Sequence, residues 1–213
     1  MNKRLIIYLL GWVFLIEGVC MQFSTIVGLI YREQSYQYFL IIGLIAISVG
    51  LIIVANKPEN VTMYVKDGFA CTAMSWIVLS LVGALPLYFS KAIPSFIDAF
   101  FETVSGFTTT GATILVDIEA LDKCMLFWRS FSHFLGGMGV VVFLLAIIPK
   151  LGGNNSINLM KAESTGPSVG KSLPKLHTYA ALLYGIYIGL TAIEFVLLLF
   201  RKLLVMQDGT RCK

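Results

Sequence analysis

The stretch S-F-I-D-A-F-F-E-T-V-S-G-F-T-T-T-G-A-T, residues 95–113, decides how the chain is interpreted. It begins apolar and ends in hydroxyls and glycines, and much longer apolar segments lie on both sides. Residues 95–107 predict a helix of about 20 Å, too short to cross a hydrocarbon core of about 30 Å. Ser95 with Asp98 three residues later is typical of a helix N-cap. Because the helical period stops after Gly106, we expect a re-entrant helix followed by an extended strand.

The residues after this short helix have the chemistry of a cation filter. A cation leaving water needs new oxygen ligands, and consecutive backbone carbonyls supply them in potassium-channel filters. Gly111 allows backbone angles that turn a carbonyl towards a pore axis. The Thr hydroxyls add oxygens, and the preceding helix presents its negative end to the ion. The alternative is a re-entrant or interfacial Gly/Thr hairpin without an ion. Non-helical backbone at membrane depth is tolerated only where protein or a wet cavity covers it.

Composition places the chain in a membrane. Of 213 residues, 57% are hydrophobic and 13% are charged, and the mean hydropathy is +0.83, whereas about a quarter of the residues of a soluble domain are charged. The basic residues lie between apolar runs, so the net charge of +4 indicates orientation and not nucleic-acid binding. The four cysteines have no CxxC spacing, and no metalloprotease or hydrolase motif occurs, so neither a zinc site nor an enzyme is expected.

Apolar runs predict an all-α membrane protein with five transmembrane helices besides the re-entrant segment. We expect these spans at residues 5–31, 36–55, 68–89, 127–149 and 179–200. Pro86 is expected to end or kink the third span. The predicted parts are a two-helix hairpin (1–67), a helix–pore helix–helix repeat (68–149), a cytoplasmic linker (150–176), and the first helix of a second repeat with a polar tail (177–213).

The distribution of Lys and Arg predicts the orientation in the membrane. One face receives Lys3, Arg4, Lys57, Lys66, Lys150, Lys161, Lys171 and Lys175, and the other receives Arg32, Lys91 and Lys123. Cytoplasmic loops carry the excess of basic residues, so we expect a cytoplasmic N-terminus and a filter mouth outside. The basic tail after residue 200 conflicts with this orientation, and we therefore expect the natural chain to continue beyond it.

Several ionisable residues fall within the expected membrane segments and are candidates for function. Glu17 and Glu194 are expected to pair with a neighbouring helix, with direct ion contact as the alternative. Asp98 is expected to cap the pore helix, and Glu102 to support the filter from behind. Arg129 and His133, four residues apart on one helical face, are expected to anchor its outer end by pairing with Asp117, Glu119 or Glu102. The small-residue patch at 136–139 predicts close helix packing, with a hinge as the alternative.

Two sequence blocks resemble the Trk/Ktr potassium-uptake family, and its TrkH members in particular. They are A-I-P-S-F-I-D-A-F-F-E-T-V-S-G-F-T-T-T-G-A-T at 92–113 and F-W-R-S-F-S-H-F-L-G-G-M-G-V at 127–140. The resemblance continues to Phe200 and implies four channel-like repeats around one pore. It implies that Thr108, Thr109, Thr110, Gly111, Ala112 and Thr113 form a quarter of the selectivity filter. Thr109 and Thr110 would then be potassium ligands, and Asp98, Glu102 and Arg129 would support the filter.

The resemblance also implies a homodimer in the inner membrane, together with a cytoplasmic, TrkA-like nucleotide-binding regulatory subunit. This chain holds the hairpin, one repeat and the start of a second, and residues 201–213 do not resemble the family. One filter segment cannot enclose an ion, because coordination needs oxygens from several strands. Two functions therefore stay open: a potassium-uptake subunit, or a truncated, non-transporting fragment that only packs with other membrane helices.

Overall fold

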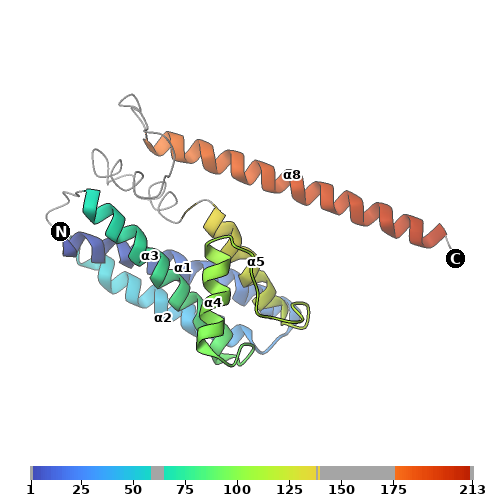
Figure 1. The fold of residues 1–213 in the computed structure, drawn as a ribbon, viewed down its shortest axis with the longest axis horizontal. Helices are drawn as coiled ribbons and strands as arrows, with labels where there is room; N and C mark the ends of the chain where they lie inside the picture. Colours follow the sequence, from blue (N-terminus) through green and yellow to red (C-terminus); the bar gives the residue numbers. More distant parts are fainter. Residues whose placement is uncertain (1, 59–64, 138, 140–175, 212–213) are drawn as a thin grey trace. The chain divides into compact units, whose positions relative to one another are not determined.

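The computed structural model describes residues 2–58, 65–137, 139 and 176–211 (Figure 1). Within these ranges the regular secondary structure is helical. The chain divides into two compact units, residues 1–169 and 170–213, each with its own internal contacts. The division falls inside the expected linker at 150–176, nearly all of which lies outside the described residues.

The first unit begins with a helical hairpin. Helix α1 spans Lys3–Tyr31 and begins two residues earlier than predicted. Helix α2 spans Tyr36–Ala55, which are the predicted bounds. Glycine brings the two backbones together: a Cβ on Gly18 would lie 2.6 Å from the carbonyl oxygen of Gly43. Close approach at small residues is how membrane helices gain van der Waals contact.

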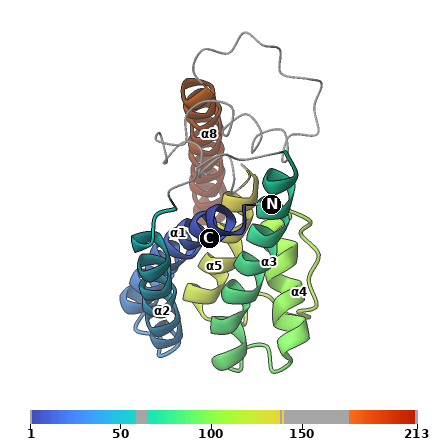
Figure 2. The same cartoon turned by 90° about the vertical axis from the view of Figure 1, so that its left-hand side faces the viewer.

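Helix α3 follows, and α4 turns back beside it. Helix α3 spans Val65–Phe89 and continues through Pro86, so of the two expectations for this proline the end of the helix is wrong, and the kink stays a prediction. Proline removes one intrahelical hydrogen bond, and here three more residues keep the helical form. Helix α4, Phe96–Phe107, packs on α3 and α5 (Figure 2). Its observed extent agrees with the short helix predicted at 95–107.

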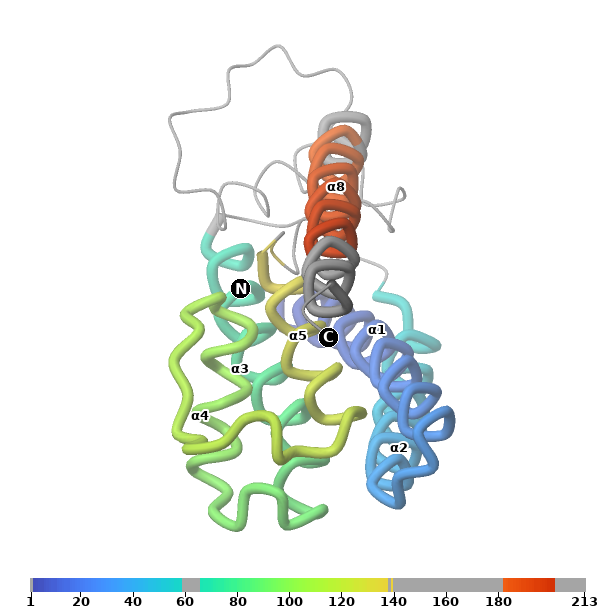
Figure 3. The backbone as a smooth tube through the Cα atoms, turned by 90° about the vertical axis from the view of Figure 1, so that its right-hand side faces the viewer, coloured from blue at the N-terminus to red at the C-terminus, as the bar shows by residue number. Residues whose placement is uncertain are grey.

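The chain after α4 doubles back. Figures 2 and 3 both show the segment after α4 returning alongside that helix and then crossing to the start of α5. Helix α5, Lys123–Gly137, packs on α1 and α4, and α1 also packs on α3. It begins four residues before the predicted start of the fourth span. The rest of that span, 138 and 140–149, lies outside the described residues.

The second unit contains one long helix, α8, at Leu176–Arg211. The candidate membrane span within it, Leu182–Arg201, agrees with the span predicted at 179–200, and the helix continues to Arg211 through the residues predicted as a polar tail. Among the described helices, four are long and apolar enough to cross a membrane. They are Lys3–Tyr31, Tyr36–Ala55, Lys66–Phe89 and Leu182–Arg201.

Candidate functional site

The C-terminus of α4 carries a Schellman-type cap that begins the expected filter. The Thr110 N–H donates to the Ser105 carbonyl at 2.9 Å, and the Thr109 N–H donates to the Gly106 carbonyl at 3.0 Å. This cap places Thr109 in the left-handed region, with φ of 56°. A β-branched residue costs energy there, and such strained positions gather at functional sites. The chain therefore turns at Thr108–Thr109 and has irregular backbone from Thr110, where an extended strand was expected.

The loop exposes a row of backbone oxygens. All six residues from Thr108 to Thr113 are exposed, and Gly111 also has a positive φ, of 74°. Within the described part of the chain, the carbonyl oxygens of residues 108–111 accept no hydrogen bond. The Ala112 carbonyl differs, because it accepts a hydrogen bond from the Ser105 hydroxyl at 2.6 Å. Four consecutive carbonyl oxygens are therefore free to meet a ligand, while Ala112 ties the loop to α4.

The threonine hydroxyls mainly hold the loop in place. Thr108 Oγ1 donates to the Val104 carbonyl at 2.8 Å and lies 2.8 Å from Thr110 Oγ1. Thr113 Oγ1 donates to Glu102 and accepts the Leu115 N–H. The hydroxyl of Thr109, by contrast, makes no hydrogen bond with the described residues. Hydroxyls were expected to be ion ligands, and in this arrangement the backbone offers more free oxygens than the side chains do.

Glu102 joins this loop to α5. Its carboxylate accepts the Ile114 N–H at 2.8 Å and the Thr113 hydroxyl through one oxygen. The other oxygen lies 3.1 Å from Arg129 Nη2. The two groups form an ion pair, but their angles do not meet the geometry of a hydrogen bond. The side chain of Glu102 is 1% exposed and that of Arg129 is 13% exposed, so the pair is shielded from water. Glu102 therefore connects the end of the loop to α5, and its role as a support of a filter stays a prediction.

Helix α5 also contacts the end of α4 through glycines. A Cβ on Gly136 would lie 2.0 Å from the Phe107 carbonyl oxygen, and one on Gly106 would lie 2.2 Å from Ser132 Oγ. The Phe107 and Trp128 rings meet edge to face at 6.2 Å, and Trp128 Nε1 donates to the Gly83 carbonyl of α3 at 3.0 Å. The last turn of α4 is therefore held between α3 and α5 without spare volume.

The other candidate residues are not brought to the loop. Asp98 lies in the first turn of α4, at the opposite end from the loop, and its N–H donates to the N-cap Ser95. His133 Nδ1 contacts the Arg129 carbonyl in its own helix. Glu17 is fully buried, and both its carboxylate oxygens lack a hydrogen-bond partner in the described residues, so the expected partner on another helix is not found there. Glu194 is exposed on α8.

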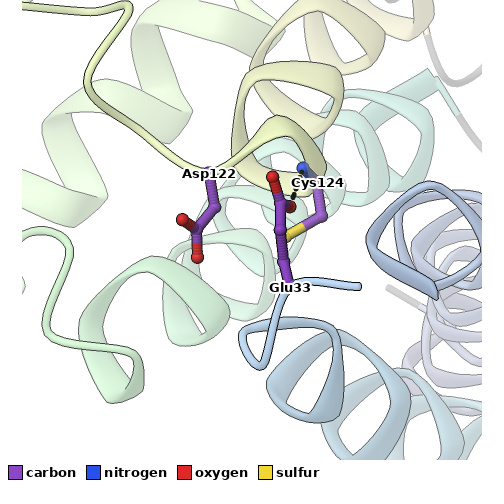
Figure 4. A group of neighbouring side chains, drawn as sticks. All are labelled: Glu33, Asp122 and Cys124. Carbon is purple, nitrogen blue, oxygen red and sulfur yellow. Dashed lines mark hydrogen bonds between the residues drawn. The ribbon is translucent and has the colours of Figure 1, made fainter. Parts of the chain in front are cut away.

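The sequence did not single out Glu33, which lies in the α1–α2 connection. Its two carboxylate oxygens accept the N–H groups of Lys123 and Cys124 at 2.6 and 2.9 Å, so a distant loop caps the N-terminus of α5 (Figure 4). Ser35 beside it donates to Asp122. The short polar connection that holds Glu33 gives no sequence signal for a contact with Lys123, 90 residues later in the chain.

The same neighbourhood brings together three groups that metals bind. Glu33, Asp122 and Cys124 have ligand atoms within 4.8 Å of one another. The oxygens of Glu33 already accept backbone N–H groups, and Asp122 accepts from Ser35. Burial, and then the hydrogen bond and charge of Glu33, raise the pKa of the Cys124 thiol to about 12. The arrangement is that of a helix cap around a protonated thiol.

In the part of the chain that the structure describes, the protein is helical, with four candidate membrane spans and a short helix that ends in an exposed carbonyl-rich loop. The family TrkH, described as a cation transport protein, matches residues 35–208. The chain belongs to this family. The match includes residues 201–208, so the prediction that the sequence after Phe200 departs from the family is wrong for them.

Individual relatives agree with the family match. The Trk system potassium uptake protein TrkH of Salmonella typhimurium is 37% identical over 194 residues, which are 90% of this chain and 40% of that protein. TrkG of Escherichia coli is 34% identical over 78% of this chain and 34% of its own length. The crystal structure of the potassium transporter TrkH from Vibrio parahaemolyticus superposes with a TM-score of 0.72 at 30% identity, covering 91% of this chain and 38% of that one. The chain spans about 40% of the length of such relatives.

Proposed function

We propose that the chain takes part in potassium uptake across the cell membrane, with residues 108–113 forming one wall of a selectivity filter. The observation that carries this proposal is the row of free carbonyl oxygens at 108–111, in a loop whose far end, at residues 113 and 114, is held by Glu102. Carbonyl oxygens replace the hydration shell of potassium in filters of this kind. The names of the relatives, potassium uptake proteins, support potassium as the ion.

The support for the loop explains how its oxygens keep their spacing. Glu102 fixes residues 113 and 114, and Arg129 fixes Glu102 in turn. Ser105 fixes Ala112, and the Schellman-type cap fixes Thr109 and Thr110. The negative end of the α4 dipole lies at this loop and favours a cation. Asp98 contributes at the other end of α4, in the first turn, where an acid stabilises the helix.

The proposed topology has five spans and one re-entrant pore helix, with the N-terminus in the cytoplasm and the protein in the inner membrane. Residues 1–67 are then a hairpin, 68–149 the first channel-like repeat, and 177–213 the start of a second. One wall encloses no ion, so the pore needs further filter segments. The family resemblance supports a homodimer and a cytoplasmic TrkA-like regulatory subunit as partners.

A chimera tests the proposal. This chain replaces the matching 40% of the Salmonella typhimurium TrkH relative, and rubidium uptake is measured in cells that lack their own potassium transporters. Uptake well above that of cells with an empty vector supports the proposal. Normal membrane insertion without uptake contradicts it and favours the alternative, a segment that packs with other membrane helices and does not conduct.

A further inference from the structure

A groove lies at one end of the α1–α2 hairpin, far along the chain from the candidate filter. It has a volume of about 450 Å³. The first turns of α1 line one wall with Arg4, Ile7 and Tyr8. The end of α2 and the residues just after it line the other wall, with Ile52 in the helix and Lys57 beyond it. The proposed pore does not use it.

The polar part of the groove is cationic. Arg4 and Lys57 are exposed, and neither forms an ion pair with the residues that the structure describes. Among the described lining residues, none is acidic. Asn56, also in the lining, uses its side-chain amide to donate to the Ile52 carbonyl at 3.0 Å. The arginine and lysine are therefore the groups available to an anion, and a guanidinium binds a phosphate through two parallel hydrogen bonds.

The remaining lining is apolar and open. Ile7 is 53% exposed and Ile52 is 66% exposed. A free anion would gain no binding energy from contact with these apolar side chains. Both lie about one turn inside the ends of two helices that are apolar enough to span a membrane. Tyr8 adds an aromatic ring, which favours the headgroup level. The groove thus has a charged end at the membrane–water boundary and an apolar wall towards the hydrocarbon core.

We infer that this groove binds one anionic phospholipid, with the phosphate between Arg4 and Lys57 and the start of an acyl chain along Ile7 and Ile52. Basic pockets between membrane helices are suited to anionic headgroups. The volume accommodates a headgroup and the first part of a chain, and the rest of the lipid stays in the bilayer. An anionic lipid can contact both the cationic and the apolar part of the lining, whereas an inorganic anion contacts only the cationic part.

The test uses the full 213-residue chain, purified in a mild detergent and titrated with phosphatidylglycerol or phosphatidylcholine. Native mass spectrometry counts the bound lipids. We expect one phosphatidylglycerol to bind at low lipid-to-protein ratio, in preference to phosphatidylcholine. The double variant Arg4→Gln/Lys57→Gln is expected to bind it roughly thirtyfold more weakly, because two cations near the headgroup are lost.

The matched control is Lys3→Gln/Lys66→Gln. It removes the same charge at the same end of the bundle, since the Asn2 N–H beside Lys3 donates to Asp67 beside Lys66 at 3.3 Å, but it leaves the groove intact. This control is expected to bind lipid as the unchanged chain does. Equal weakening in both double variants, or none in either, would overturn the inference. Inorganic phosphate that displaces the lipid at millimolar concentration would also overturn it, because the groove would then be a site for a free anion.

Discussion

The guanidinium of Arg129 lies 3.1 Å from the carboxylate of Glu102, and the same carboxylate accepts hydrogen bonds from the loop that follows α4. One buried side chain therefore joins helix α5 to Thr113, the last residue of the candidate filter, and to Ile114 after it. Because the pair is shielded from water, removing either partner leaves a charge with no compensation. The loop and α5 are expected to lose their relative position together.

Single substitutions in this pair are expected to be far more harmful than the double one. Glu102→Gln or Arg129→Met each leaves one buried charge, at a cost of roughly 3 kcal/mol. The double variant Glu102→Gln/Arg129→Met removes both charges and is expected to recover part of that loss. Thermal unfolding of the chain in detergent measures the three variants.

The matched control is Lys123→Met, which removes a cation from the exposed first residue of α5. It is expected to change stability by no more than about 0.5 kcal/mol. If Arg129→Met is no more destabilising than Lys123→Met, or if the single effects simply add, the ion pair does not hold the loop.

The contact between α4 and α5 predicts a rescue at one glycine and none at another. In Gly106→Ala the new Cβ meets the Ser132 hydroxyl at 2.2 Å, and the next atom, Ser132 Cβ, at 3.2 Å. Adding Ser132→Ala removes the hydroxyl and is expected to restore most of the roughly 1–3 kcal/mol lost to overpacking. In Gly136→Ala the obstacle is the Phe107 carbonyl at 2.0 Å, which no side-chain change removes.

Unfolding temperatures of these variants, together with Gly136→Ala/Ser132→Ala, check the prediction. Gly189→Ala on α8 is the control, because a Cβ there meets nothing within 4 Å. Rescue of Gly136→Ala by Ser132→Ala, or no rescue of Gly106→Ala, would mean that the two helices do not approach through these residues.

The thiol of Cys124 is expected to react slowly with maleimide at neutral pH. Its pKa is raised to about 12, first by burial and then by Glu33, so only the protonated, unreactive form is populated below that pH. Glu33→Gln removes the negative charge, lowers this pKa, and is expected to speed the reaction at a given pH. The rate is measured against pH with the other three cysteines changed to serine.

Unfolding also speeds thiol reactions, so the control is Glu119→Gln, an exposed acid that does not contact the thiol. The Glu119→Gln rate is expected to equal that of the unchanged chain, and melting temperatures identify any general loosening. A Glu33→Gln rate equal to the Glu119→Gln rate would contradict the capping contact.

The sequence predicted helix bounds well where hydrophobic runs and nearby capping residues determine them. Helix α2 has its predicted bounds, and α4 begins after Ser95, because hydrophobic runs and caps act over a few residues. The start of α5 was missed because Glu33 caps it from another part of the chain. The sequence did not predict that α8 continues after Phe200, because the polar residues there were interpreted as a tail. Arg, Lys, Leu and Gln nevertheless favour helix intrinsically.

The sequence proposes the residues of the candidate site but does not predict their geometry. Gly111 and the threonines indicated oxygen ligands, and Glu102 was placed behind them. That the Ala112 carbonyl turns back to Ser105, and that Thr109 takes a left-handed conformation, depend on contacts between residues on both sides of the turn. Hydrophobic periodicity carries no information about such contacts.

Selectivity at Gly111 tests the central claim most directly. Gly111 has a φ of 74° with nothing within 4 Å of an added Cβ, so Gly111→Ala causes no clash and costs about 1 kcal/mol through backbone strain alone. The measurement is the ratio of rubidium to sodium uptake by the chimera with Salmonella typhimurium TrkH, with Gly185→Ala on α8 as the unstrained control. We predict that Gly111→Ala lowers the ratio several-fold at unchanged membrane insertion, while Gly185→Ala leaves it intact. An unchanged ratio in Gly111→Ala would show that residues 108–111 do not face the ion.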